Sequence, residues 1–210
     1  MKADQRRKQL IDVAVELFAQ KGFGGTTTRE IANAARVNEA IIFRHFKTKE
    51  GLYSAILDQR ARDTLSEEAL EALRGLATLG DDEGFFRFLV QRILHAYRDY
   101  PQYQRLLLFS SLEKHPFAKG YQQRFVVPAH EFVREYIEKR QQEGAFRACD
   151  ARLAVFALTA MAVQFGTNKW LFKHSEPQVT EEEVIKTVAE LFLGGMRVHP
   201  GEPEPSESPL

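Results

Sequence analysis

The sequence predicts an all-α protein of about nine helices, and two observations support this fold class. Apolar residues recur three and four positions apart through most of the chain, which is the spacing that places side chains on one face of a helix. No segment shows the strict alternation of apolar and polar residues that is typical of a half-buried strand, and no internal repeat is present. The expected helices are separated by short segments that contain glycine, proline or a capping residue.

Start and stop signals divide the first fifty residues. Apolar residues from Leu10 to Phe18 share one face of a first helix, and Gly22 is the expected end of that helix. The stretch Thr27-Thr28-Arg29-Glu30 fits a capping box, because a threonine is followed three residues later by a glutamate. A second helix is therefore expected from about residue 28 to residue 35.

A third helix is expected at 39–45, with Asn38 as its N-cap, so only Arg36, Val37 and Asn38 join it to the second. Two short helices with such a connection form a helix-turn-helix. The second helix is short enough to lie in the major groove of DNA, and the first helix braces it. The inward side chains that would hold the pair together are Ile31, Ala35, Val37, Ile42 and Phe46.

Six further helices are expected after residue 48. Thr48 can cap the first of them, and the segment from Gly75 to Gly84 is expected to be a loop. Pro128 lies inside the longest expected helix, where a proline predicts a kink. The tail at residues 200–210 has no apolar anchor and is expected to be disordered. The six expected ranges are 49–73, 85–100, 101–113, 115–143, 150–172 and 181–198.

The composition allows a sizeable core in one or two domains, since 44% of the 210 residues are hydrophobic. The net charge is zero, but the charges are unevenly distributed. Residues 1–60 hold 11 Lys and Arg against 7 Asp and Glu, whereas the other 150 residues hold 18 against 22. A basic N-terminal part on a slightly acidic body indicates a polyanionic partner at that end of the chain.

Several classes of protein are disfavoured. The single cysteine, Cys149, leaves no intrachain disulfide or cysteine-based zinc site and suits a reducing compartment. The first residues resemble no signal peptide, and the apolar stretch from Leu153 to Phe165 is too short to span a bilayer. We therefore expect a cytoplasmic protein without a membrane partner. No HExxH motif, glycine-rich phosphate loop or metal-spaced set of Cys and His is present, so we expect no enzyme, no cofactor and no metal.

The stretch AVELFAQKGFGGTTTREIANAARVNEAIIFRHFKTKEGL resembles the N-terminal domain of the TetR family of transcriptional regulators. The family pattern has A-x-x-L-F-x-x-x-G, then T-T-x-x-I-A-x-x-A-G-V-S, and then an aromatic-x-H-F before K-x-x-L. The resemblance covers roughly residues 9–57. Two positions depart from the pattern, because Arg36 replaces the glycine of the turn and Phe43 replaces the usual tyrosine. A positive φ at Arg36 would cost about 1 kcal/mol or more, and Phe43 lacks a hydroxyl for a phosphate.

The resemblance implies a dimeric regulator that binds a double-stranded DNA operator and responds to a small-molecule effector. On this basis we expect a DNA-binding domain at residues 1–50, which the helix at 49–73 joins to a ligand-binding and dimerisation domain at residues 51–199. The expected function is that of a repressor which a small apolar or aromatic ligand releases from its operator. The alternative is a structural or nucleoid DNA-binding protein, or an activator, without a small-molecule inducer.

Phosphate contacts are expected at both ends of the helix-turn-helix. Thr27 and Thr28 offer N–H groups and hydroxyls at a helix N-terminus, which is an anion site. The resemblance and the neighbouring cations favour phosphate contact for His45, Lys47 and Lys49. The alternative for the two lysines is an ordinary solvated face, and the alternative for His45 is a packing role.

Base contacts are expected on the outer face. Arg29 could reach guanine and Glu39 could accept from cytosine, although Glu39 could equally complement the dipole of its own helix. Phe43 could belong to the core, but Ile42 and Phe46 already fill that side, so we expect an exposed ring. The complete set of expected DNA-binding residues is Thr27, Thr28, Arg29, Glu39, Ala40, Ile41, Phe43, Arg44, His45, Lys47 and Lys49.

The body of the chain is rich in aromatic residues, since twelve of the 16 phenylalanines lie after residue 80. Most of these rings are expected in the core, and some could line an internal cavity for an apolar or aromatic ligand, which the resemblance favours. The expected pocket residues are Phe88, His95, Tyr103, Phe109, Phe125, Phe132, Gln164 and Asn168.

Small residues recur between Ala151 and Gly166 and again at Gly194-Gly195, and small side chains let helices approach closely. This stripe could serve internal packing. However, one helix-turn-helix reads only a half-site, and twofold symmetry places two reading helices about 34–36 Å apart. The resemblance points to a four-helix dimer interface, with an apolar centre formed by Val155, Leu158, Met161, Ala162, Val188, Leu191 and Phe192.

Overall fold

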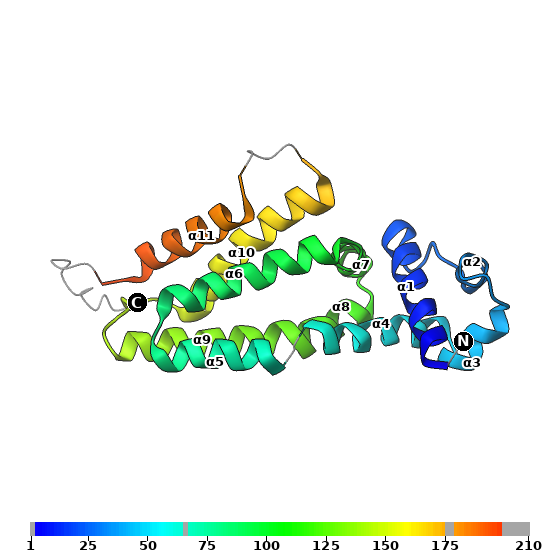
Figure 1. Cartoon of the computed structure of the whole chain (residues 1–210), viewed down its shortest axis with the longest axis horizontal. Helices are drawn as coiled ribbons and strands as arrows, with labels where there is room; N and C mark the ends of the chain where they lie inside the picture. The colour runs from blue at the N-terminus through cyan, green and yellow to red at the C-terminus, as the bar shows by residue number, and fades with distance from the viewer. Residues whose placement is uncertain (1–2, 65–66, 175–178, 199–210) are drawn as a thin grey trace. The chain divides into compact units, whose positions relative to one another are not determined.

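The structure of the protein is a computed structural model that describes residues 3–64, 67–174 and 179–198. Every regular element within these ranges is helical, with eleven α-helices and two π-helical segments (Figure 1). The predicted all-α fold is therefore confirmed. None of the helices in these ranges has the length and apolar character that a membrane crossing requires. The tail at residues 200–210, which was expected to be disordered, lies outside the described residues.

The helices follow one another with short connections. Two of them, α7 and α8, begin with a proline, which is favoured in the first turn because its missing N–H would have no partner there. The elements are α1 (Ala3–Lys21), α2 (Thr28–Ala34), α3 (Glu39–Phe46), α4 (Lys49–Thr64), α5 (Glu67–Leu79), α6 (Asp82–Asp99), α7 (Pro101–Leu112), α8 (Pro116–Tyr121), η1 (Gln122–Val126), α9 (Val127–Gln142), α10 (Ala151–Gly166), η2 (Thr167–Phe172) and α11 (Glu181–Met196).

Three of the nine predicted helices are divided in the structure, and one of them is the predicted helix at 150–172, which consists of α10 and the π-helical segment η2. The predicted helix at 49–73 corresponds to α4 and α5, and residues 65–66 between them lie outside the described residues. The predicted helix at 115–143 consists of α8, η1 and α9, with the π-helical segment just before Pro128. Proline has no N–H, so the carbonyl one turn earlier loses its usual hydrogen bond, and a π-helical turn accommodates that loss.

The predicted loop from Gly75 to Gly84 is wrong in its first half. α5 continues to Leu79, because Leu73 is buried in the core and Leu76 packs against it. The chain then turns at Gly80, whose φ of +65° favours glycine. α6 begins soon afterwards at Asp82.

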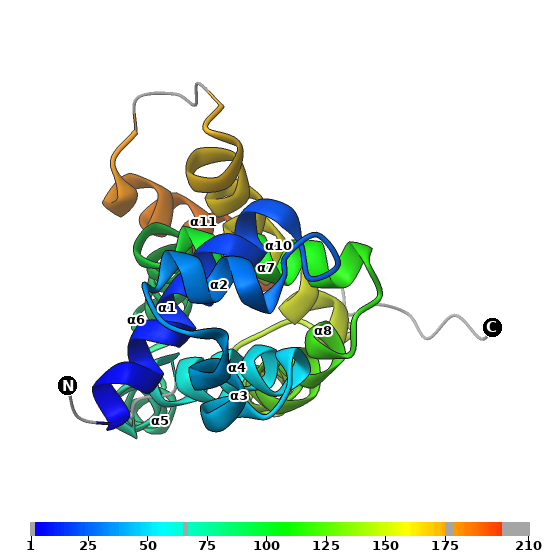
Figure 2. The ribbon, with the colours of Figure 1, turned by 90° about the vertical axis from the view of Figure 1, so that its right-hand side faces the viewer.

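The chain divides into two compact units, each with its own core. The first unit contains residues 1–67 and 99–126, so α1 to α4 pack with α7, α8 and η1. Figure 2 shows α1, α2, α3 and α4 gathered around one another. Tyr53 lies edge-on to Phe18, with 4.7 Å between the ring centroids, and its hydroxyl is 2.6 Å from the Ser110 hydroxyl. Through this packing α7 belongs to the same unit as the N-terminal helices. The expected boundary between a DNA-binding and a ligand-binding domain at residue 50 stays a prediction.

The second unit contains residues 68–98 and 127–210, and in the described part it holds α5, most of α6, α9, α10, η2 and α11 (Figure 1). Asp82 at the start of α6 accepts two hydrogen bonds from Arg140, at 2.8 and 2.9 Å, and one from the Tyr136 hydroxyl at 2.6 Å. α6 and α10 cross closely where the Tyr97 ring covers Gly166. Large buried side chains such as Phe85 and Phe86 fill the space between these helices.

Candidate nucleic-acid interface

Side-chain caps begin both short helices of the N-terminal region, as the sequence predicts. Thr27 Oγ1 accepts from the Glu30 N–H at 3.2 Å, and the Glu30 carboxylate accepts from the Thr27 N–H at 2.8 Å, which completes the capping box of α2. Lys21 donates to Glu30 at 2.7 Å, and this bond together with those from Thr27 lowers the pKa of the Glu30 carboxyl to about 2. Asn38 Oδ1 accepts from the Ala40 N–H at 2.8 Å and caps α3.

The turn between α2 and α3 holds Arg36 at a φ of +54°, in the left-handed region that glycine favours. Beneath the turn, Ile31, Ala35 and Ile42 are buried and fix the two helices against each other. The Arg36 side chain is exposed. A side chain in this backbone conformation costs about 1 kcal/mol, so the turn carries a cation at the expense of some stability.

A second cationic residue with a positive φ ends α3, which the sequence analysis did not predict. Lys47 has a φ of +64°, and its N–H donates to the Phe43 carbonyl at 2.9 Å. The next residue, Thr48, caps α4 by accepting from the Gly51 N–H at 2.9 Å. Both ends of α3 are therefore fixed by local hydrogen bonds, and the Lys47 side chain is exposed.

The outer face of α3 carries the residues that the sequence places there. The Phe43 ring is 45% exposed, which confirms that it lies outside the core. Ala40 and Arg44 are also exposed, whereas Glu39 and Ile41 are half-buried. On the opposite face, Ile42 and Phe46 are buried. Whether these outer side chains contact DNA remains a prediction.

Exposed cations without an acidic partner surround α3. Within the part of the chain that the structure describes, no carboxylate lies within 4.0 Å of the side-chain nitrogens of Arg29, Arg36, Arg44 or Lys47. The second unit differs, because its arginines with a carboxylate partner include Arg87, Arg98, Arg134, Arg140 and Arg152. The positive charges near α3 are therefore available to an external anion.

Both threonine hydroxyls at the start of α2 have partners within the chain. The Thr27 hydroxyl donates to Glu30 Oε2 at 2.9 Å, and the Thr28 hydroxyl donates to Glu39 Oε1 at 2.5 Å. A phosphate at these hydroxyls would compete with the two glutamates, and DNA contact by Thr27 and Thr28 stays a prediction. Glu39 thereby connects the first residues of α2 and α3, in addition to lying at the positive end of its helix.

The ammonium group of Lys49 points into its own unit. It donates a hydrogen bond to the Phe23 carbonyl and lies 4.1 Å from the centroid of the Phe23 ring. Burial lowers the pKa of Lys49. The expected phosphate contact at this residue thus competes with an intramolecular one. The signal that the sequence analysis missed is Phe23, an aromatic residue directly after the glycine that ends α1.

His45 lies beside the end of α3 with its Nε2 atom enclosed. Within the described residues, this nitrogen has no hydrogen-bond partner. Enclosed polar atoms in folded proteins usually have a partner. In this conformation the nitrogen is not accessible to a phosphate oxygen, so the expected phosphate contact of His45 stays a prediction.

The residues expected to line a ligand pocket are divided between the two units. Tyr103, Phe109 and Phe125 belong to the first unit, and the other five belong to the second. Tyr103 and Phe125 are buried in the core of the first unit. In the second unit, Phe88 and Phe132 are half-buried and pack against its core. A pocket formed by these residues stays a prediction.

Three polar members of the expected pocket, His95, Gln164 and Asn168, have partners within the second unit. His95 Nε2 lies 2.9 Å from the Glu181 carboxylate, and Gln164 donates to the Asn168 side chain at 2.9 Å. These contacts hold α6 to α11 and stabilise the junction of α10 with η2. Each of the three side chains therefore has a structural role in the second unit.

Most residues that the sequence assigned to a dimer interface face the core of their own unit instead. Val155, Leu158, Ala162, Val188 and Phe192 are buried there, because neighbouring helices already cover that side of α10 and α11. Met161 is half-buried against the same core, whereas Leu191 is 66% exposed. The large apolar side chains that these helices leave exposed are Leu153, Phe156, Val163 and Leu191.

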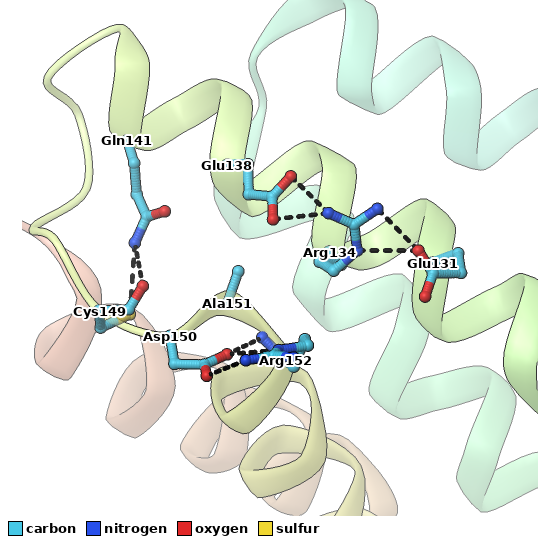
Figure 3. A pocket seen from close by; sticks show the side chains of 8 residues that line it. All are labelled: Glu131, Arg134, Glu138, Gln141, Cys149, Asp150, Ala151 and Arg152. Carbon is cyan, nitrogen blue, oxygen red and sulfur yellow. Dashed lines mark hydrogen bonds and ion pairs between the residues drawn. The ribbon is translucent and has the colours of Figure 1, made fainter.

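The charged side chains along one surface groove of the second unit pair with one another. A groove of about 520 Å³ lies between α9 and the start of α10 (Figure 3). In it Arg134 pairs with Glu131 and Glu138, and Arg152 pairs with Asp150, which lowers the pKa of that carboxyl to about 2. Among the residues that the structure covers, no group of three or more side chains could hold a metal ion.

Comparisons with known proteins agree with this arrangement. The family model described as "Bacterial regulatory proteins, tetR family" matches residues 10–56. The model described as "Tetracyclin repressor-like, C-terminal domain" matches residues 80–196, which is more than half of the chain. The first match covers α2 and α3 with their caps, and the second covers most of the aromatic-rich body.

Two relatives and one solved structure illustrate the likeness. An uncharacterized HTH-type transcriptional regulator of Bacillus subtilis strain 168, YvkB, is 50% identical over 54 residues, which are 26% of this chain and 29% of that protein. The HTH-type transcriptional activator FasR of Mycolicibacterium smegmatis is 25% identical over 193 residues, which are 92% of this chain and 84% of that protein. AibR, solved in complex with isovaleryl coenzyme A and operator DNA, is 20% identical, has a TM-score of 0.67, and is aligned over 89% of this chain and 97% of its own.

These relatives share a fold and a class of function. The structural likeness at 20% identity supports the fold alone. The family matches extend over both the N-terminal helices and the body, and the family consists of regulators rather than enzymes. This chain belongs to the TetR family of DNA-binding transcriptional regulators.

Proposed function

We propose that this protein recognises a double-stranded DNA operator through α3 and the cations around it. The observation that carries the proposal is a set of exposed cations, which includes Arg36, Arg44 and Lys47, for which the described residues provide no acidic partner. Such side chains gain free energy at DNA because they release counterions that are condensed on the phosphates. Ala40 and the exposed Phe43 ring supply apolar contacts for thymine methyl groups in the major groove.

His45 and Lys47 complete the phosphate contacts in this proposal. His45 is half-buried near the end of α3 and would have to turn to bring a ring nitrogen to a phosphate, whereas Lys47 is exposed at the end of α3. Arg29, which is exposed in the first turn of α2, is a candidate for a guanine contact. Glu39 already binds Thr28, so we assign it to the junction of α2 and α3 rather than to cytosine.

The protein acts as a homodimer in this proposal, because a single helix-turn-helix covers only a half-site. The apolar side chains that α10 and α11 leave exposed support a second copy as the partner. Leu153, Phe156 and Leu191 are each about two-thirds exposed, at 67%, 66% and 66%. Large apolar side chains that stay exposed on neighbouring turns of one helix, as Leu153 and Phe156 do, are typical of protein interfaces.

A small apolar or aromatic effector in the body of each subunit would control DNA binding. Support comes from the aromatic-rich second half of the chain and from AibR, whose structure contains isovaleryl coenzyme A together with operator DNA. The effector must bind the DNA-bound and the released conformation with different affinity, since a ligand with equal affinity shifts no equilibrium. In this proposal the DNA-bound protein represses transcription in the cytoplasm, and the effector relieves the repression by releasing the protein from its operator.

Activation is the second candidate function, because FasR, the relative aligned over 92% of this chain, is named an activator. The two candidates share the DNA contacts and differ in what the bound protein does to transcription. A reporter gene placed behind the operator distinguishes them. Deletion of the regulator raises expression for a repressor and lowers it for an activator.

A selection experiment tests the proposed DNA recognition. The purified protein is incubated with a pool of random duplexes, and the retained duplexes are sequenced after several rounds. We expect a palindromic site whose half-sites lie one turn of DNA or a multiple of it apart, about 34–36 Å per turn. Enrichment of no sequence, or of a site without twofold symmetry, would contradict the proposal. The selected duplex then serves in a screen for small molecules that release the protein.

A further inference from the structure

Three consecutive cations, Arg6, Arg7 and Lys8, lie in the first two turns of α1, outside the helix-turn-helix. A helix N-terminus carries a partial positive charge, so cations there are repelled by the helix dipole. Within the described ranges, no carboxylate lies within 4.0 Å of their side-chain nitrogens. The chain thus keeps three unneutralised charges at a place where they destabilise the helix.

Two contacts connect these cations to the two ends of the recognition segment. Arg6 donates to Gln9 at 2.6 Å, and Gln9 in turn donates to the Ala35 carbonyl at 3.2 Å, directly before Arg36. The Arg7 guanidinium lies 5.4 Å from the ring centroid of Phe46, at the end of α3. Figure 1 shows the same proximity, with the dark-blue end of α1 beside α3.

The contacts leave the charges of these side chains available. Gln9 is neutral, so it orients Arg6 without cancelling its charge. An aromatic ring binds the face of a guanidinium and leaves its N–H groups free to donate at the edge. Lys8 is exposed, whereas Arg6 and Arg7 are half-buried and therefore held in place. α1 thus holds Arg6 close to the residue before Arg36 and Arg7 close to the residue before Lys47, and the exposed Lys8 follows them on the same helix.

We infer that Arg6, Arg7 and Lys8 form a second phosphate-binding site, which contacts the DNA backbone beside the major groove that α3 enters. This inference rests on the proposed function, because α3 must occupy the groove for α1 to meet the flanking backbone. It adds a contact from α1 to those of α2 and α3. The partner is the phosphate backbone of duplex DNA, so the site increases affinity without reading sequence.

Salt dependence of DNA binding tests the inference. The double variant Arg6→Gln/Lys8→Gln is compared with the wild type by fluorescence anisotropy, on the selected operator and on an unrelated duplex, at several KCl concentrations. The matched control is Arg74→Gln/Lys186→Gln, which removes the same charge from exposed positions of the second unit. Each lost phosphate contact lowers the slope of log K against log salt by about 0.9. We expect a slope reduced by about 1 to 2 in the test variant and unchanged in the control.

The two duplexes separate the outcomes. An equal loss of affinity on operator and unrelated DNA, with the smaller slope, supports a backbone contact. A folded double variant whose salt slope equals that of the wild type overturns the inference. A loss of affinity that is confined to the operator overturns it as well. If the wild type binds neither duplex, the proposed function itself fails. Circular dichroism monitors folding, and we expect an unchanged or slightly raised melting temperature because repulsion from the helix dipole is relieved.

Arg7 is tested by itself, because its removal also changes the packing of Phe46. Arg7→Lys keeps the charge and loses the planar contact, whereas Arg7→Gln loses both. We expect Arg7→Lys to retain the wild-type salt slope and Arg7→Gln to lower it by about 0.9. Equal slopes for both variants at the wild-type value would exclude Arg7 from the site.

Discussion

The ammonium group of Lys49 donates a hydrogen bond to the carbonyl oxygen of Phe23 and lies 4.1 Å from the centroid of its ring. The backbone N–H of Phe23 donates to the Glu113 carboxylate at 3.3 Å. The segment between α1 and α2 is therefore held from α4 on one side and from the end of α7 on the other. Lys49 positions the helix-turn-helix from within its own unit, and Lys47 is the neighbouring lysine that faces solvent.

Replacement of Lys49 by Met is expected to lower the free energy of unfolding by about 1–2 kcal/mol, because a charged hydrogen bond and a cation–π contact are lost at a partly exposed site. Urea denaturation measures this change. Lys47→Gln is the matched control, which should leave stability within about 0.5 kcal/mol of the wild type and reduce the salt slope of DNA binding by about 0.9. The reverse pattern, with stability lost at Lys47 and salt slope lost at Lys49, would show that Lys49 is the phosphate contact.

Replacement of Arg36 by glycine is expected to raise stability and weaken DNA binding. At a φ of +54° an arginine costs about 1 kcal/mol, which glycine relieves, although glycine also gains freedom in the unfolded chain. We therefore expect a net gain of up to about 1 kcal/mol in the free energy of unfolding. The accompanying loss of one phosphate contact reduces the salt slope by about 0.9. A variant that is less stable than the wild type would show that the Arg36 side chain contributes more to folding than its exposure indicates.

Charged substitutions on the exposed face of α10 and α11 are expected to separate the proposed dimer. Phe156 and Leu191 are each 66% exposed, so Phe156→Glu/Leu191→Glu should leave the core intact and yield folded monomers that lose specific DNA binding. Multi-angle light scattering at micromolar concentration measures the mass. In contrast, Ala162→Arg places a charge at a fully buried position and is expected to unfold the second unit. A folded double-glutamate variant that remains dimeric would mean that the copies meet through another surface.

Gly166→Ala is expected to destabilise the second unit. An added Cβ would lie 2.7 Å from Cγ of Tyr97, which is too close for either helix to accommodate without a shift. Overpacking of this kind costs about 1–3 kcal/mol. Gly75→Ala is the matched control, because nothing lies within 4 Å of the added Cβ in the middle of α5, and it should stabilise by about 0.5–1 kcal/mol. Thermal unfolding followed by circular dichroism compares the two, and equal melting temperatures would show that α6 and α10 can separate.

Features that depend on residues within about one helical turn are predicted correctly from the sequence. Thr27, Asn38 and Thr48 cap helices as expected, since a cap depends only on residues within one turn. Exposure on α3 is also predicted correctly, because a short amphipathic helix has one apolar face, and Ile42 and Phe46 define it.

The errors concern residues whose partners are distant in the sequence or whose helix is apolar on more than one face. Glu113 lies 90 residues from Phe23, so no local pattern indicates that its carboxylate binds the backbone of Phe23. α10 is apolar nearly all around, and its periodicity cannot distinguish the face that packs inside from the face that is exposed. Val155 and Phe156 are adjacent and both apolar, yet only Phe156 is exposed. Tertiary contacts alone decide between them.

Acid is expected to weaken the capping box of α2 over a defined range. Hydrogen bonds from Lys21 and Thr27 lower the pKa of Glu30 from 4.5 to about 2. The folded chain therefore binds a proton at Glu30 less readily than the unfolded chain does. The stability that this carboxylate contributes is complete above about pH 4.5 and is lost as the pH falls towards 2. The difference in unfolding free energy between the wild type and Glu30→Gln should decrease over the same range.

The second capping box provides an internal comparison for this titration. Glu183 caps α11 through Thr180, and those hydrogen bonds lower its pKa without a lysine partner. Lys21→Met should raise the titration midpoint of the Glu30 carboxyl and leave that of Glu183 unchanged, because only Glu30 receives a bond from Lys21. Carbon-detected NMR of the side-chain carboxyl groups measures both midpoints in one sample. A Glu30 midpoint that is unaffected by Lys21→Met would mean that the Thr27 bonds alone hold its pKa down.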